Sequence, residues 1–127
     1  MANITKRDIE EMFSDKVRKD LQDGTKFGKN AISEIADALY NSPSARRNLQ
    51  NMMEHNMQSG KSNKGVIRPY KDAGGANAGF EDNNQAVIRI GTGMTGQGNG
   101  YVAGSAKAAA VLIAREAGLF SLNGTYR

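Results

Sequence analysis

The sequence predicts a mainly helical α+β fold: three N-terminal helices, a short two-stranded ribbon with glycine-rich loops, and one buried C-terminal helix. Apolar residues recur at helical spacing through most of the first 57 residues. Two short β-branched runs then lie among glycine and asparagine, and an alanine-rich apolar stretch follows. The length of 127 residues indicates one compact domain, with a helical region over 1–60 and the ribbon and last helix over 61–127.

The first predicted helix begins after Thr5, which with Asp8 resembles a capping box. We expect it to continue to Gly24, because apolar residues keep to one helical face: Ile9, Met12, Phe13, Val17 and Leu21. A second helix is expected over about 30–40, and the chain must leave it before Pro43, since a residue preceding proline avoids the helical region.

A third helix is predicted from Pro43 to about Gly60, with Ser42 as its capping residue and proline at the first helical position. Its apolar face contains Leu49, Met52, Met53 and Met57. Methionine packs adaptably, so this face belongs either to the core or to a surface that binds a partner.

The ribbon is predicted from two similar segments, Val66–Tyr70 and Ala86–Ile90. Pro69 lacks an N–H group, so the first segment is expected to be very short or to lie at an edge. The glycine- and asparagine-rich stretch over 72–84 has few side chains that pack, and we expect a long loop there.

The last helix is predicted over 105–117 and is apolar on most of its surface. A helix of this kind needs burial on most sides, so it is either the central element of the fold or part of a subunit interface. The residues expected in such an oligomer interface are Ala109, Ala110, Leu112 and Ile113.

The composition excludes several classes of site. The chain has no cysteine, which excludes disulfides, thiolate zinc sites and cysteine nucleophiles. His55 is the only histidine and is expected at a surface or boundary position. No spacing in the sequence gathers the ligands of a metal site, so we expect no catalytic residues, no metal and no cofactor. No apolar run is long enough to span a bilayer, and the N-terminus has no signal-peptide pattern, so the expected location is the cytoplasm or a virion.

The net charge of +4 is unevenly distributed. Residues 1–29 are nearly balanced, whereas 61–71 contain four basic residues and no acidic one. A positive surface suits an anionic partner such as nucleic acid, and Tyr70 lies nearby to stack on a base. The residues expected to bind nucleic acid or another anion are Arg46, Arg47, Lys61, Lys64, Arg68, Lys71 and Lys107.

Six of the 15 glycines lie between Gly91 and Gly104, after a predicted strand and before a predicted helix. This arrangement suits either phosphate binding or close backbone packing. A phosphate loop would use Gly93, Gly96, Gly104 and Ser105. Residues 91–96 match Gly-x-Gly-x-x-Gly, but the helix begins about nine residues later and no acidic residue follows at the required spacing, so we exclude a Rossmann site.

Residues 98–107, GNGYVAGSAK, resemble a short stretch of the ADP-ribosyltransferases. In that family a glycine-rich stretch with a tyrosine leads into a lysine-bearing helix beside the nicotinamide pocket, so the resemblance implies an enzyme site at this loop. The family also carries a late catalytic glutamate on further strands. This chain departs from that pattern, because Glu116 lies inside the predicted helix.

We interpret the chain as a non-enzymatic interaction or assembly protein that acts as a homo-oligomer. The thin core, the apolar last helix and the lack of a catalytic cluster motivate this interpretation. Small cysteine-free chains are frequent among phage proteins, which suggests a virion component or a host-directed inhibitor. Two alternatives stay open: a nucleic-acid-binding module using the basic tract over 46–71, and a small nucleotide-binding protein or enzyme centred on Gly91–Lys107.

Overall fold

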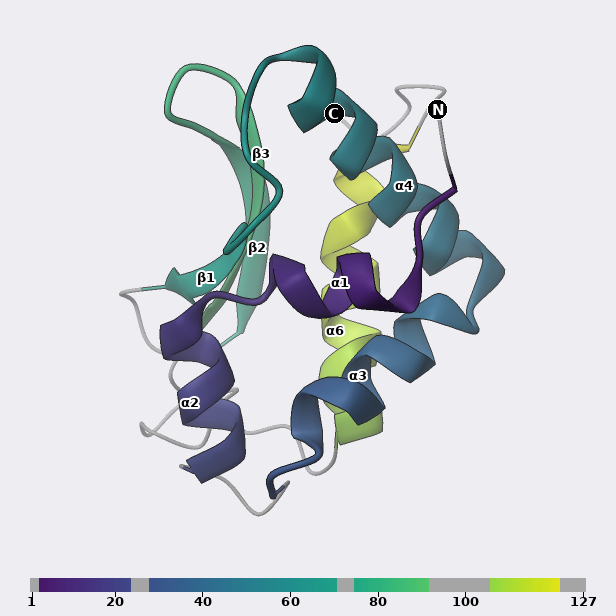
Figure 1. The fold of residues 1–127 in the computed structure, drawn as a ribbon, viewed down its shortest axis with the longest axis vertical. Helices are drawn as coiled ribbons and strands as arrows, with labels where there is room; N and C mark the ends of the chain where they lie inside the picture. Colours follow the sequence, from purple (N-terminus) through teal and green to yellow (C-terminus); the bar gives the residue numbers. More distant parts are fainter. Residues whose placement is uncertain (1–2, 24–27, 71–74, 92–105, 122–127) are drawn as a thin grey trace.

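The computed structural model describes residues 3–23, 28–70, 75–91 and 106–121. The sheet occupies one side of the molecule, α6 runs through the middle, and α1 crosses the front in the view of Figure 1. This arrangement confirms the α+β class. The helices are α1 (Lys6–Met12), α2 (Asp15–Asp23), α3 (Ala31–Tyr40), α4 (Pro43–Gln58) and α6 (Ala106–Ala117), followed by a 3₁₀ turn, η1 (Gly118–Phe120). The strands are β1 (Ile67–Tyr70), β2 (Ala76–Glu81) and β3 (Gln85–Gly91).

The expected first helix is two helices, so four helices precede the sheet where the sequence predicted three. Phe13 leaves the helical conformation, with φ −75° and ψ 125°, and forms a bridge with Ile67. Ser14 donates its N–H to the Ile67 carbonyl at 2.9 Å, and its hydroxyl accepts the N–H of Val17 at 3.2 Å. Ser14 therefore caps α2, and the break exists because this part of the chain pairs with β1.

The capping predictions for α1 and α4 are confirmed. Thr5 and Asp8 form the expected reciprocal capping box. The Ser42 hydroxyl accepts the N–H of Ala45, with Pro43 at the start of α4. Gly60 has φ +69°, and the N–H groups of Gly60 and Lys61 bond back to Met57 and Asn56 as in a Schellman motif, so the helix ends where the glycine predicts.

Within the described residues the sheet has three strands in the order β1-β3-β2, where the sequence predicted a two-stranded ribbon. β1 and β3 pair in parallel, with Ile67 opposite Ile88 and Arg68 opposite Arg89, so the two similar segments do pair. β2 lies within the stretch predicted as a loop and pairs antiparallel with β3. β1 is an edge strand, as Pro69 indicated.

The β2–β3 turn contains three successive non-glycine residues with positive φ: 47° at Asp82, 61° at Asn83 and 89° at Asn84. Asn and Asp tolerate this region better than other residues with a side chain. The Asn84 carbonyl accepts a hydrogen bond from Nε2 of His55 at 2.8 Å, which ties the turn to α4. His55 is half-buried, a boundary position within the surface-or-boundary expectation, and it connects two elements.

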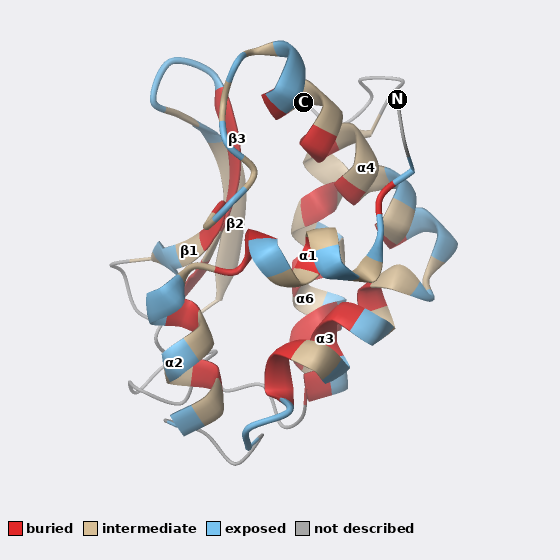
Figure 2. Ribbon diagram, viewed as in Figure 1, coloured by how far each residue is buried: buried red, intermediate tan, exposed pale blue. Residues whose placement is uncertain are grey.

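α6 lies at the centre of the core, which confirms one of the two expectations for this helix. It packs against α3, α4, β2 and β3. Figure 2 colours parts of α6 as buried, and its buried residues are Ala106, Ala109, Ala110, Ile113 and Ala117. The core contains residues from both the 1–60 and the 61–127 segments, including Leu49 and Met52 from α4 and Ile88 from β3.

One buried polar side chain joins α4 to the sheet. Asn56 is fully buried; its Oδ1 accepts the Ala86 N–H at 2.7 Å, and its Nδ2 donates to the Ala86 carbonyl at 3.1 Å. The same Nδ2 also donates to Asn63. Asn56 thus satisfies the backbone groups with which β3 begins, and this contact fixes the sheet against α4.

Candidate functional site

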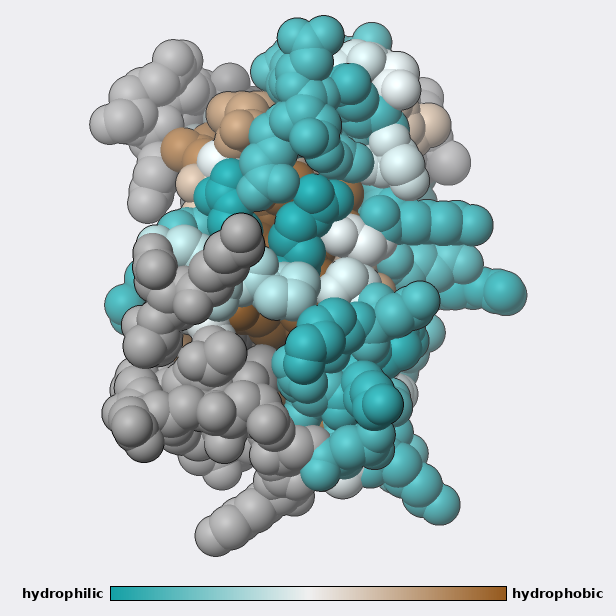
Figure 3. Space-filling view, turned by 90° about the vertical axis from the view of Figure 1, so that its left-hand side faces the viewer, coloured by the Kyte–Doolittle hydropathy of each residue, from teal (hydrophilic) through white to brown (hydrophobic). Residues whose placement is uncertain are grey.

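The outer face of the sheet, turned away from the helices, holds a network of charged side chains. One Glu81 carboxylate oxygen accepts from Arg68 at 3.0 Å, and the other accepts from Nε of Arg89. Arg89 also donates to Oδ1 of Asn77 at 2.8 Å. Because the three charged residues come from three different strands, the network holds the strands together. Figure 3 looks at this side of the molecule, and hydrophilic residues dominate its described part.

The two arginines set the ionisation of Glu81. Burial alone raises the pKa of this carboxyl, but the hydrogen bond and charge of Arg89, together with those of Arg68, outweigh it and hold the pKa below its usual value of 4.5. Glu81 is therefore a carboxylate at neutral pH, and both guanidinium groups share its charge. This pairing supports a structural role for the outer face.

The outer edge of β1 is closed. Ile88 donates its N–H to the Val66 carbonyl at 2.9 Å, so Ile67 and Pro69 direct their backbone groups away from β3. The Ile67 carbonyl already accepts the N–H of Ser14, and Pro69 has no N–H to offer. A further strand therefore finds few partners at this edge.

The outer edge of β2 is open as far as the described residues go. Gly91 donates its N–H to the Gly75 carbonyl at 2.7 Å, so these two residues form a hydrogen-bonded pair. In an antiparallel ladder, hydrogen-bonded and non-hydrogen-bonded pairs alternate along the strand. The backbone groups that point toward β3 are therefore those of Asn77, Gly79 and Glu81. Those that point away from the sheet, with no partner in the described part of the chain, belong to Ala76, Ala78 and Phe80.

The side chains of β2 leave this edge accessible. The strand contains no proline and no lysine, and its one charged residue, Glu81, lies at its end. The Phe80 side chain is half exposed (50%). The centre of its ring lies 5.1 Å from the centre of the His55 ring and 5.7 Å from the centre of the Phe120 ring. Edge strands usually carry a feature that blocks further pairing, and β2 shows none beyond its terminal charge.

Two of the predicted basic residues lie together at the start of α4. Arg46 and Arg47 line an open groove of about 420 Å³ with Tyr40 and Gln50. The Arg46 guanidinium lies 5.2 Å from the centre of the Tyr40 ring and donates to the Tyr40 carbonyl at 3.2 Å, while Arg47 is exposed. An arginine beside an aromatic ring suits a planar or anionic ligand.

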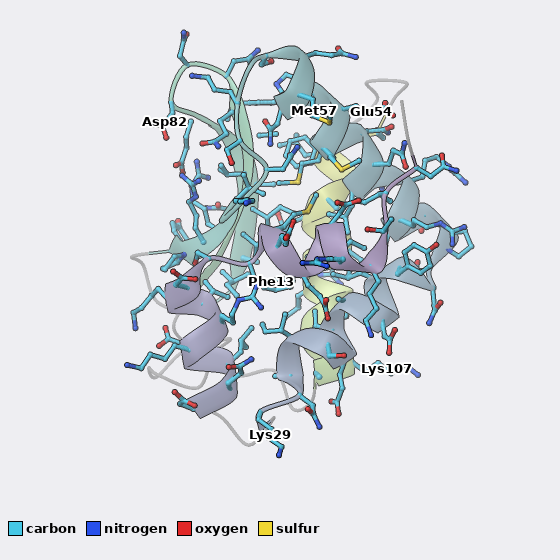
Figure 4. The ribbon with its side chains drawn as sticks, viewed as in Figure 1. Phe13, Lys29, Glu54, Met57, Asp82 and Lys107 are labelled. Atoms are coloured by element: carbon cyan, nitrogen blue, oxygen red, sulfur yellow. The ribbon has the colours of Figure 1, made fainter. Side chains whose placement is uncertain are left out.

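The other predicted basic residues do not join this pair. Lys61 lies beyond the far end of α4, and that end is about 16 Å along the helix axis from Arg47. Lys64 lines a different groove with Glu11 and Asp15. Lys107 shares a hollow with Glu34 and Asp37, and Figure 4 places it at the opposite end of the molecule from Asp82. Arg68 forms a salt bridge with Glu81, and Lys71 lies outside the described residues.

The residues expected in an oligomer interface lie mostly inside the chain. Ala109, Ala110 and Ile113 are buried in the core, and Leu112 is half buried. The exposed apolar residue of α6 is Val111. The candidate phosphate-loop residues lie outside the described residues: Gly93, Gly96, Gly104 and Ser105.

Sequence reasoning missed the residues of the β2 edge. Alternation of β-branched and polar residues is the usual signal of a strand, and Ala76–Glu81 contains no β-branched residue. The Asp82–Asn84 turn was the one available signal, since Asp and Asn accept positive φ.

Among the described residues no group of His, Asp and Glu has the arrangement of a metal site. Nor does that part of the chain contain a helix whose length and apolar character would let it cross a membrane. Comparisons with protein-family models, with curated proteins and with solved structures find no match for the chain.

Proposed function

We propose that the chain is a non-enzymatic interaction and assembly protein that acts as a homo-oligomer. The observation that carries this proposal is the outer edge of β2, where the backbone groups of Ala76, Ala78 and Phe80 have no partner among the residues that the structure describes. Exposed sheet edges recruit further strands, because main-chain hydrogen bonds supply affinity without a dedicated pocket. A virion subunit or a host-directed inhibitor would use such a surface.

The ion pairs of the sheet support the same proposal. Arg68 and Arg89 each pair with Glu81, so the ion pairs join three strands and stabilise a rigid platform beside the edge. A strand held in place before association loses less conformational entropy when it pairs.

Native mass spectrometry of the untagged chain at low ionic strength tests the proposal. We expect a discrete multiple of the 13.6 kDa chain mass with nothing added. If the protein stays monomeric up to about 100 μM, a concentration well above the dissociation constant of a stable interface, the proposal is contradicted.

A second candidate function, nucleic-acid binding, is favoured by the groove that contains Arg46, Arg47 and Tyr40. Binding of nucleic acid weakens steeply as the salt concentration rises, because binding releases the cations that surround the phosphates. Fluorescence anisotropy with a single-stranded 20-mer at low salt tests it. We expect Arg47→Glu to weaken binding about tenfold and Lys107→Glu, at another site, to have little effect. Equal losses in both variants, or no binding by the wild type, would exclude this groove as the site.

A further inference from the structure

We propose that two copies of the chain join by antiparallel pairing of their β2 strands, which forms a six-stranded sheet across a two-fold axis at Ala78. This inference rests on the proposed function and adds the surface, the symmetry and the register. It also predicts that assembly stops at the dimer.

The register follows from the direction of the backbone groups. Only Ala76, Ala78 and Phe80 point their N–H and C=O groups outward from β2. In an antiparallel pair centred on Ala78, this residue faces Ala78 of the partner subunit, while Ala76 faces Phe80 of the partner subunit. Every outward group of the strand is then matched, with two hydrogen bonds in each residue pair.

The side chains on the inner face fit this register. Ala76 and Ala78 are small and half buried, and Phe80 is half exposed. Pairing about Ala78 places the ring of Phe80 over Ala76 of the partner subunit, and an aromatic ring opposite a small residue meets no steric conflict. The most exposed apolar side chain of the sheet thereby loses contact with water.

The charges favour an antiparallel over a parallel arrangement. Glu81 ends β2, and Arg89 reaches Asn77 near the beginning of the strand. An antiparallel pair places Glu81 of one copy diagonally across from Asn77 of the partner subunit, beside its arginine. A parallel pair would instead bring the two Glu81 carboxylates together, and like charges on neighbouring strands repel.

The closed edge of β1 limits the assembly. Once the β2 strands have paired, both outer edges of the joined sheet are β1 strands. At each β1 edge the Ile67 carbonyl already accepts the N–H of Ser14, and Pro69 has no N–H. A two-fold interface uses the same surface on both copies, and in the part of the chain that the structure describes it leaves no second open edge. The expected product is a closed dimer rather than a fibril.

A proline at the axis tests the surface. Ala78→Pro removes an outward N–H, while the bonds to β3 come from Asn77 and Gly79 and are kept. We expect this variant to stay folded by circular dichroism and to raise the dimer dissociation constant about 100-fold, whereas the matched control Ala78→Ser keeps the wild-type constant. A folded Ala78→Pro variant that dimerises as tightly as the control would overturn the inference.

Cysteine cross-linking tests the register and also decides the matter if the proline variant fails to fold. The chain has no cysteine, so a single introduced thiol can react only with its copy in the partner subunit. Residues facing each other in a hydrogen-bonded pair have Cα atoms about 5.5 Å apart, within the range of a disulfide. We expect Ala78→Cys to form a covalent dimer on mild oxidation and Ala76→Cys not to form one. The reverse result, or equal cross-linking, would overturn the register.

The outcomes separate this inference from the proposed function. A monomeric wild type contradicts both. A wild-type oligomer that survives Ala78→Pro keeps the proposed function and overturns the β2 interface. Species larger than a dimer keep the proposed function and overturn the closed two-fold arrangement, and binding of an unrelated strand without self-association contradicts the commitment to a second copy.

Discussion

Two glutamates lie in surroundings that shift their pKa in opposite directions. Arg89 and Arg68 hold the pKa of Glu81 below 4.5 against the effect of burial. At Glu116, on α6, burial raises the pKa and the nearby charge of Arg115 offsets only part of that effect. The first carboxylate therefore stabilises the fold when ionised, and the second destabilises it.

This contrast predicts opposite effects of pH on two variants. The stabilisation that ionised Glu81 gives the fold is present above about pH 4.5 and is lost as the pH falls through its lower pKa in the folded state. Glu81→Gln should therefore lower the free energy of unfolding by about 1–2 kcal/mol at pH 7. The penalty at Glu116 is present above its raised pKa, so Glu116→Gln should gain roughly 0.5 kcal/mol at pH 7. Urea unfolding measures both. Each difference should shrink in acid, and two shifts of the same sign at pH 7 would refute this assignment.

At the scale of elements, the β2–β3 turn is the clearest site of backbone strain. Asn83 is exposed and has φ +61°, a conformation that glycine adopts without cost. We expect Asn83→Ala to be about 1 kcal/mol less stable than Asn83→Gly, with thermal unfolding as the measurement. Asn51→Ala compared with Asn51→Gly is the matched control inside α4, where the order should reverse. The same order at both positions would show that φ at Asn83 does not set its stability.

The helices could be predicted because their signals are local. Thr5, Ser42 and Gly60 act on backbone groups within a few residues, and the structure confirms each. The division of the first helix depends on the pairing of Phe13 and Ser14 with Ile67, about fifty residues later in the chain, and the buried apolar pattern runs through the break. A contact of this kind leaves no periodic signal.

The strands show the same distinction. β1 and β3 were expected from β-branched residues. β2 forms because β3 supplies its hydrogen-bond ladder and because the Arg89 side chain lies over Gly79, with Nη1 3.5 Å from the position that a Cβ would take. The basic residues were close in sequence, yet α4 carries Arg47 away from Lys61. Proximity in sequence therefore did not predict one anion-binding surface.

At the scale of the whole molecule, α6 organises the packing, because its buried face touches α3, α4 and the sheet. Ala109→Asp places a charge among these elements and should cost at least about 3 kcal/mol, enough to unfold a small domain. Val111→Asp lies on the exposed face of the same helix and should stay folded. Circular dichroism and thermal unfolding check the pair, and a folded Ala109→Asp variant would disprove this core assignment.

Residue-resolved amide hydrogen exchange, measured by NMR at low and at high protein concentration, shows whether β2 pairs with β2 of a second copy. The N–H groups of Asn77, Gly79 and Glu81 point into the sheet and should be protected at both concentrations, whereas those of Ala76, Ala78 and Phe80 should exchange fast when dilute and slowly when concentrated. If Ala76, Ala78 and Phe80 are equally protected at both concentrations, or are unprotected at both, β2 does not pair with its copy.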